Sequence, residues 1–142
     1  MKTVTPRIDP SARKWWVVDL QGAKPGRAAV KIADILRGKN KPIFAPHLDN
    51  GDNVIAINAA EMKVGAKKLL QKKYYRYSGY PGGLSETTMG SMMEKKPEQV
   101  FSLAVKRMIP KNKLGRKVFK KLHVYAGSAH PHRAQNPEKL EL

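Results

Sequence analysis

Two short apolar runs separated by a helical pattern organise the first half of the chain. The runs at residues 15–18 and 53–57 have the length of strands, and the second is rich in β-branched residues, as in strands buried on both faces. Between them, apolar residues recur every three or four positions from 27 to 36, and Gly38 provides a stop signal for a helix. This order predicts a parallel β-α-β unit with a right-handed crossover.

Helical spacing returns in the second half and again leads into an apolar strand. Pro97 is placed as the first residue of a helix, where its missing N–H costs no hydrogen bond. Residues 100–108 and 114–122 each show one apolar helix face, and residues 123–125 predict a strand. The second half of the chain thus adds helices and a further strand to the β-α-β unit.

The remaining segments read as arms and loops around a single domain. Residues 1–14 are polar and hold two prolines, so we expect an N-terminal arm. Residues 62–85 combine lysines and tyrosines and close on glycines, which predicts a basic, aromatic loop instead of a core element. We expect residues 131–142 to form an extended C-terminal tail, which leaves one α/β domain over residues 15–130.

The net charge indicates the class of partner. The 142 residues include 28 Lys or Arg against 11 Asp or Glu, for a net charge of +17 at pH 7 and an isoelectric point near 10.2. Solubility of a small domain needs a net charge of only about 2–8. The excess therefore indicates a polyanionic partner, and a nucleic acid backbone is the leading candidate.

Several classes of site are excluded or disfavoured by composition. The chain has no cysteine, which excludes disulfides, thiolate catalysis and thiolate metal sites. It shows neither the apolar core of a signal peptide nor an apolar run of about 18 residues. We therefore expect an intracellular, cytoplasmic protein without a membrane partner.

Two long segments lack acidic residues altogether. Residues 62–85 contain six Lys or Arg, and residues 99–137 contain nine Lys or Arg with three His. Lysine and arginine bind phosphate by charge-assisted hydrogen bonds, and tyrosine rings can stack on unpaired bases, which suits RNA better than a smooth duplex. Two separate basic segments predict an extended footprint on the partner, not a single groove reader.

Other chemistry is less well supported by the residues. Gly22 and Gly26 fit neither dinucleotide nor Walker spacing, so we expect at most a single backbone phosphate near Arg27. His47, Asp49 and Asp52 could serve a small phosphate-ester or nucleotide enzyme, although Asx residues beside glycine more often build turns. An architectural DNA-binding protein is a third hypothesis.

A histidine-based metal site is also disfavoured. His130 and His132 flank Pro131, which constrains their geometry, and no carboxylate lies nearby to support a ligated metal. We expect surface or phosphate-contacting histidines, and neither a metal ion nor a cofactor.

A series of motifs in fixed order identifies a family. The chain carries W-V-V-D at 16–19, L-R-G-K at 36–39, P-H-x-D-x-G-D at 46–52, S-G-Y-P-G-G at 78–83, P-K-N-K-L-G-R at 110–116 and K-L-H-V-Y-A-G at 121–127. In this order they closely resemble the bacterial ribosomal protein L13 family of the large subunit, over roughly residues 14–137. Pro25, the pair at 65–66, Tyr77 and Arg107 depart from residues common in that family.

The resemblance implies a fold and a role. The implied fold is a three-layer α/β sandwich with helices on both faces of a mainly parallel sheet, extended basic loops and terminal arms. The implied role is a structural, non-catalytic protein without a cofactor that binds large-subunit, 23S-type rRNA and supports early subunit assembly. The implied partners are that rRNA and neighbouring large-subunit ribosomal proteins, with no small-molecule substrate and no obligate homo-oligomer.

The expected RNA contacts are basic, aromatic or able to hydrogen-bond to phosphate. They are Arg27, Arg37, Lys39, Lys41, His47, Lys67, Lys68, Lys72, Lys73, Tyr75, Arg76, Tyr77, Lys106, Arg107, Lys111, Asn112, Lys113, Arg116, Lys117, Lys120, Lys121, His130, His132 and Arg133. Those that match the family motifs most directly are Arg27, Arg37, Lys39, Lys106, Lys111, Lys113 and Arg116. We expect no catalytic residue and no metal ligand among them.

Overall fold

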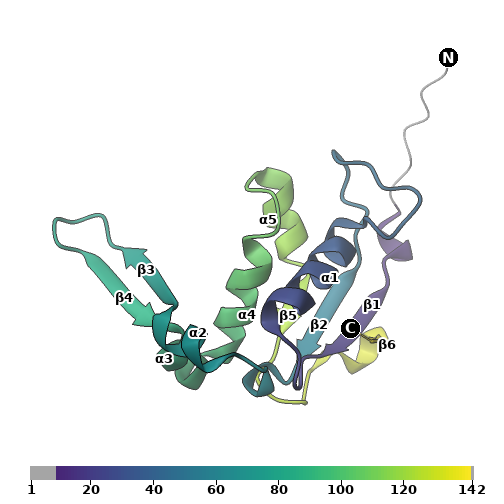
Figure 1. Cartoon of the computed structure of the whole chain (residues 1–142). Helices are drawn as coiled ribbons and strands as arrows, with labels where there is room; N and C mark the ends of the chain where they lie inside the picture. The colour runs from purple at the N-terminus through teal and green to yellow at the C-terminus, as the bar shows by residue number, and fades with distance from the viewer. Residues whose placement is uncertain (1–8, 142) are drawn as a thin grey trace.

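Four parallel strands form the central sheet. The computed structural model describes residues 9–141. β1 (Trp15–Asp19), β2 (Asn53–Ile57), β5 (Leu122–Val124) and β6 (Glu138–Leu140) lie side by side in the order β5-β2-β1-β6 (Figure 1). Each neighbouring pair in this sheet is parallel. The predicted α/β fold with a mainly parallel sheet is therefore confirmed.

The first helix makes the predicted crossover between β1 and β2. α1 (Pro25–Arg37) begins at Pro25, where a missing N–H is harmless. Gly38 ends the helix in the left-handed region at φ 79°, and its N–H donates to the Ile35 carbonyl at 3.0 Å. A Cβ at position 38 would also lie 2.9 Å from the carbonyl carbon of Asn50, so both the backbone angle and the space require glycine here.

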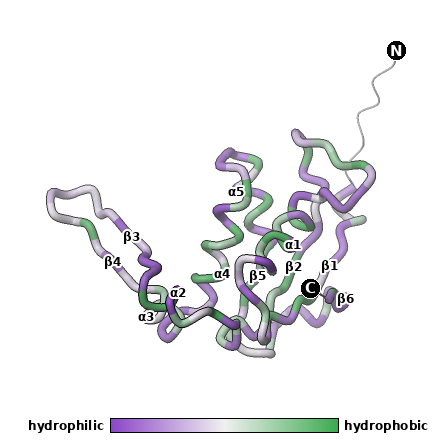
Figure 2. The backbone as a smooth tube through the Cα atoms, viewed as in Figure 1, coloured by the Kyte–Doolittle hydropathy of each residue, from purple (hydrophilic) through white to green (hydrophobic). Residues whose placement is uncertain are grey.

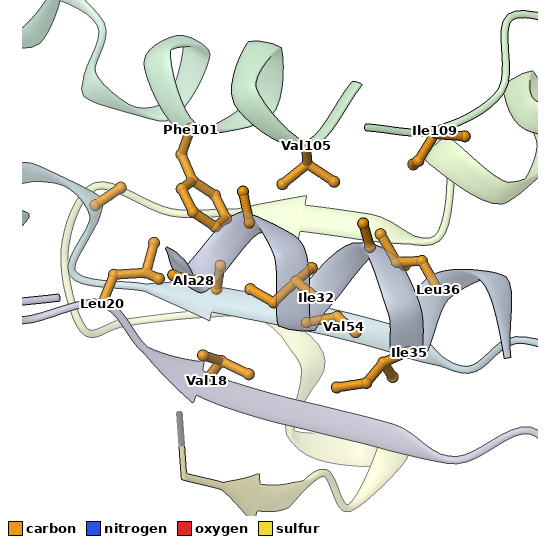
Figure 3. Close-up of a cluster of buried hydrophobic side chains, with 14 of the residues drawn as sticks. Val18, Leu20, Ala28, Ile32, Ile35, Leu36, Val54, Phe101, Val105 and Ile109 are labelled. Carbon is orange, nitrogen blue, oxygen red and sulfur yellow. The ribbon is translucent and has the colours of Figure 1, made fainter. Parts of the chain in front are cut away.

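One face of the sheet carries the main hydrophobic core. α1 packs on this face, α4 (Pro97–Lys106) packs across α1, and α5 (Lys113–Phe119) also contacts α1 (Figure 3). The fully buried side chains of this core include Val18, Leu20, Ile32, Leu36, Val54, Phe101 and Val105. Each such burial contributes about 1.5–3 kcal/mol relative to an exposed side chain, so this core is the main favourable term in the stability of the body.

The opposite face of the sheet is covered by the C-terminal segment. Trp15 of β1 and His123 of β5 stack there with ring centroids 5.6 Å apart. The 3-10 helix η3 (His132–Gln135) lies against them, since the His132 ring is 5.3 Å from Trp15. β6 then pairs with β1 at the edge of the sheet. The expectation of an extended tail over residues 131–142 is thus corrected, because its described part contributes a strand and a cover.

A hairpin with two short helices projects from the body. The elements are α2 (Ala66–Gln71), β3 (Lys73–Tyr77), β4 (Leu84–Thr88) and α3 (Met89–Lys95), and the hairpin reaches away from the central sheet (Figure 1). β3 and β4 pair antiparallel. The loop predicted over residues 62–85 is therefore corrected to a helix followed by an ordered hairpin. In Figure 2 the tube of β3 is mostly hydrophilic, whereas hydrophobic positions recur along β2 and α4.

The described part of the N-terminal arm is bound to the body. Residues 1–8 of the expected arm lie outside the described residues. The described part begins with the 3-10 helix η1 (Pro10–Ala12). A second 3-10 helix, η2 (Ala59–Glu61), lies elsewhere, directly after β2. Arg13 then forms an ion pair with Asp49 at 3.2 Å, which ties the arm to a distant loop.

Among residues 9–141, no helix is both long and apolar enough to cross a membrane.

Candidate nucleic-acid interface

A basic cleft lies between the beginnings of α1 and α2. It has a volume of about 570 Å³ and is lined by five cations, which we call the α1–α2 cleft residues: Lys24, Arg27, Lys63, Lys67 and Lys68. None of the five forms a salt bridge within residues 9–141. Their charges are therefore available to an external anion.

Backbone hydrogen bonds bring the two sides of this cleft together. The N–H of Gly22 donates to the carbonyl of Glu61, and the N–H of Lys63 donates to the carbonyl of Ala23, each at 3.0 Å. The first turn of α1 has no side-chain cap and no acidic residue. Its free amides and positive dipole end add to the charge of the lysines, an arrangement that favours phosphate.

Sequence reasoning found only part of this cleft. Arg27, Lys67 and Lys68 were expected RNA contacts, whereas Lys24 and Lys63 were not among them. Lys63 lies in the segment of residues 62–85, which has no acidic residue, and that absence could have indicated Lys63 as an RNA contact. Lys24 joins the cleft only through the folding of the β1–α1 loop against residues 61–63, which no local pattern reveals.

A second basic hollow lies where α4 passes into α5. It has a volume of about 170 Å³, and we call its cations Lys106, Lys111 and Arg116 the α4–α5 hollow residues. Ile109 and Phe119 also line it, and the Lys106 Nζ lies 5.9 Å from the centre of the Phe119 ring. This hollow brings together four expected RNA contacts, its three cations and Asn112.

The turn that forms this hollow is fixed by two local contacts. Asn112 is the N-cap of α5, and its Oδ1 accepts a hydrogen bond from the Gly115 N–H at 2.6 Å. A Cβ at Gly115 would lie 1.8 Å from the Pro110 carbonyl oxygen, so only glycine allows this close approach. The expected contact Asn112 thus has its side-chain oxygen occupied in the fold. Lys113, Lys117 and Lys120 are exposed along α5.

One expected RNA contact, Lys121, is buried inside the protein. The side chain is nearly inaccessible, at 6% exposure for the residue. Its Nζ donates to the Leu36 carbonyl at 3.0 Å and forms an ion pair with Asp49. Burial lowers the pKa of Lys121, and the hydrogen bond to Asp49 opposes that shift. The expectation of a phosphate contact at Lys121 is corrected. Its ammonium group is occupied inside the protein, where it links the residue before β5 to the end of α1 and to Asp49.

Two of the three residues of the enzyme hypothesis, Asp49 and Asp52, belong to the same internal network as Lys121. Asp52 accepts hydrogen bonds from the Lys14 N–H at 3.0 Å and the Trp16 Nε1 at 3.2 Å, and it pairs with Lys41. Asp49 pairs with Arg13 and Lys121. His47 lies on an exposed loop. Asp49 and Asp52 therefore have a structural role, because each is paired with cations of the protein itself. Lys41, an expected RNA contact, is one of these cations.

The histidines near the C-terminus contact protein side chains. The rings of His123 and His132 lie 4.6 Å apart, and the Tyr125 hydroxyl is 2.8 Å from the Nε2 of His132. His130 is half-buried, and its Nδ1 has no hydrogen-bond partner within residues 9–141. No group of three metal-ligating side chains occurs in that same range. His132 therefore packs the C-terminal segment onto the sheet and is not a free surface histidine.

The hairpin exposes tyrosines beside its cations. Tyr75 and Tyr77 are 61% and 63% exposed. Lys73 forms an ion pair with Glu86 at 2.8 Å, whereas Arg76 is exposed. Tyr74 is buried, and its ring lies near Lys72 and Arg107, at 5.6 and 5.8 Å from the centre.

The remaining expected contacts are scattered over the body. Arg37 is half-buried, Lys39 pairs with Asp34 at 3.1 Å, and Arg133 is exposed on η3. These residues do not converge on either basic hollow in the described residues. The structure thus brings the expected contacts together at the α1–α2 cleft, the α4–α5 hollow and the hairpin.

Comparison with known proteins places the chain in a family. The sequence model of the family described as ribosomal protein L13 matches residues 13–131. A large ribosomal subunit protein uL13 from Aquifex aeolicus is 56% identical over 142 residues, which is 100% of this chain and 99% of the relative. The uL13 of Lachnospira eligens is 57% identical over the full length of both chains, and that of Oleidesulfovibrio alaskensis is 54% identical over 100% of this chain and 99% of its own.

These relatives are ribosomal proteins and not enzymes, which removes the hypothesis of a phosphate-ester or nucleotide enzyme. The match covers most of the chain, including the cations of the α1–α2 cleft and the α4–α5 hollow. The resemblance found in the ordered motifs is confirmed. The chain belongs to the ribosomal protein L13 family.

Proposed function

We propose that this protein is a structural component of the large ribosomal subunit that binds 23S-type rRNA. The observation that carries the proposal is that the cations of the α1–α2 cleft and the α4–α5 hollow have no carboxylate partner within residues 9–141. The names of the relatives support the same role. In this role the protein works in the cytoplasm, within the ribosome, beside neighbouring large-subunit proteins.

The arrangement of the cations suggests how the protein binds. Phosphate contacts supply affinity, while the fixed shape of the binding surface selects among folded RNA segments. The α4–α5 hollow is built on two helices of the main core, and backbone hydrogen bonds of Gly22 and Lys63 join the two sides of the α1–α2 cleft, so both surfaces are shaped before RNA arrives. A preorganised surface of this kind binds without a large ordering cost, and it supports an early role in subunit assembly.

A competition experiment tests the proposed partner. Labelled large-subunit rRNA fragments are bound to the protein, and unlabelled folded rRNA or duplex DNA of equal length is added at constant salt. We expect folded rRNA to compete far more strongly than duplex DNA, because the basic surface is spread over several loops and is not one groove-reading element. Equal competition by DNA would instead support the architectural DNA-binding hypothesis.

Paired substitutions test which cations take part. We expect Lys67→Gln with Lys68→Gln, and separately Lys106→Gln with Lys111→Gln, to weaken rRNA binding about tenfold or more each, from the loss of two charge-assisted contacts. Lys139→Gln is the matched control, because Lys139 lies on β6 beside Asp19 and Glu141. The proposal is contradicted if the control weakens binding as much as either pair.

A further inference from the structure

The two faces of the β3–β4 hairpin differ in what they contact. Successive residues of a strand point to opposite sides, so Lys73, Tyr75 and Tyr77 share one face. The register of β4 adds Leu84 opposite Tyr77 and Glu86 opposite Tyr75 on that same face. We call Tyr75, Tyr77 and Leu84 the tyrosine face; all three are more than half exposed, at 61%, 63% and 57%.

The other face of the hairpin anchors it to the body. Tyr74 is buried in a small hydrophobic cluster with Met89 and Val100, which belongs to α4. Lys72 and Arg107 lie near its ring, at distances compatible with cation–π attraction. The anchor sets the direction of the hairpin, and the tyrosine face is therefore presented outward on a supported element.

Charge argues against an apolar protein as the occupant of this face. Residues 62–88 hold six Lys or Arg and a single acidic residue, Glu86. That one carboxylate is already paired with Lys73 at 2.8 Å. An exposed aromatic surface within so positive a module is complementary to a polyanion that also offers flat apolar rings, and unpaired RNA has both properties.

The spacing of the rings specifies the state of the RNA. Residues two apart on a strand are separated by about 6.8 Å, roughly twice the 3.4 Å rise between stacked bases of one nucleic acid strand. Two neighbouring bases must therefore separate from each other to lie on the two rings. A paired helix cannot offer this arrangement, whereas a loop or bulge can.

We propose that the tyrosine face binds unpaired RNA by stacking one base on Tyr75 and another on Tyr77, with Leu84 bordering the site. This inference rests on the proposed rRNA-binding function and adds a contact of a different kind. The basic hollows hold backbone phosphates, whereas the hairpin recognises nucleotides that are free of pairing.

Substitution of both tyrosines by valine tests the site. Valine removes the rings but keeps a β-branched residue, so the strand is retained. The probes are a 12-nucleotide mixed-sequence single-stranded RNA, the same sequence as a duplex, and a full-length large-subunit rRNA transcript. We expect Tyr75→Val with Tyr77→Val to weaken single-strand binding by about 5- to 150-fold per ring lost, with the duplex unaffected.

Two matched measurements separate stacking from other effects. Tyr75→Phe with Tyr77→Phe keeps the rings and loses only the hydroxyls, so we expect its single-strand affinity to stay within about twofold of the parent protein. Stacking carries no charge, so the dependence of affinity on salt should keep its slope in the valine variant. A circular dichroism melt of each variant checks that the hairpin and body remain folded.

The outcomes distinguish this inference from the proposed function. Unchanged single-strand affinity in the folded valine variant would overturn the stacking site, and so would an equal loss on the duplex. Equal loss in the phenylalanine variant would overturn it as well, since hydroxyls would then be responsible. If the valine variant binds all three probes normally but enters large subunits poorly, the face contacts a protein. Failure of the parent protein to bind the rRNA transcript would instead refute the proposed function.

Discussion

At the scale of single residues, neighbouring lysines have opposite roles. Lys120 is exposed at the end of α5, whereas Lys121 is buried and pairs with Asp49. Both belong to the same acid-free segment, and nothing in the local sequence separates them. The partner of Lys121 lies 72 positions away, so its role depends on how the loop of residues 39–52 closes over α1.

Substitution of these two lysines separates stability from binding. We expect Lys121→Met to lower the free energy of unfolding by about 3 kcal/mol, because it breaks a buried ion pair. The loss is limited because Arg13 still pairs with Asp49. We expect Lys120→Met to change stability by less than about 0.5 kcal/mol and to weaken rRNA binding. Urea unfolding and rRNA titration of both variants check this pair of outcomes; the reverse pattern would contradict the roles given to the two lysines.

At the scale of elements, the C-terminal cover of the sheet depends on stacked aromatic rings. Trp15 and His123 come from strands, and His132 comes from η3, which joins β5 to β6. The Tyr125 hydroxyl adds a hydrogen bond to His132. A charged imidazole is poorly tolerated in such a cluster, so attachment of this cover should depend on pH.

We expect the protein to lose stability as pH falls below about 6.5. Burial lowers the pKa of His123 from its ordinary value of 6.5, and the nearby His132 lowers it further. The unfolded chain therefore takes up a proton before the folded protein does. This contribution to stability is present above pH 6.5 and is lost as the pH falls through the folded pKa.

Urea unfolding at pH 7.5, 6.5 and 5.5 measures this effect. His123→Phe keeps a ring beside Trp15 but cannot titrate, so its stability should fall less between the first and last pH. His47→Asn is the control, because it removes an imidazole from an exposed loop and leaves the Trp15–His123–His132 cluster intact. Identical pH profiles for the parent and His123→Phe would show that His123 does not carry the effect.

The elements that carry their own hydrophobic signal could be predicted from the sequence. β2 was predicted at residues 53–57 and occupies Asn53–Ile57, and the helix predicted to begin at Pro97 does begin there. The hairpin was missed because β3 is basic and aromatic and has only Tyr74 buried. β6 was missed because Glu138–Leu140 is short and polar and becomes a strand only by pairing with β1.

The sequence showed which segments are basic, but it did not show which cations lie together in the folded protein. Absence of acidic residues predicted basic surfaces in residues 62–85 and 99–137, and most cations of these segments are exposed and form no ion pair within residues 9–141. The α1–α2 cleft joins residues 24–27 to residues 63–68, which are separated in the sequence by most of α1, a long loop, β2 and η2. Such a grouping follows from tertiary structure, so the pattern of residues could not reveal Lys24 as part of a site.

At the scale of the whole molecule, one hydrophobic core supports a surface that carries the basic hollows and the aromatic hairpin. The α4–α5 hollow lies on the helices that pack on the sheet, the α1–α2 cleft lies where the projecting module meets the body, and the hairpin extends away from the sheet (Figure 1). Within residues 9–141, the excess of positive charge is therefore displayed on a folded frame. We propose that this frame neutralises many phosphates of one RNA at the same time.

The salt dependence of rRNA binding measures how many phosphates the protein neutralises. If the five cations of the α1–α2 cleft and the three of the α4–α5 hollow each neutralise one phosphate, the slope of log K against log salt should be about −6 to −7. Affinity for the rRNA transcript would then fall roughly 10⁴-fold between 50 and 200 mM salt. A nearly flat response would contradict the account.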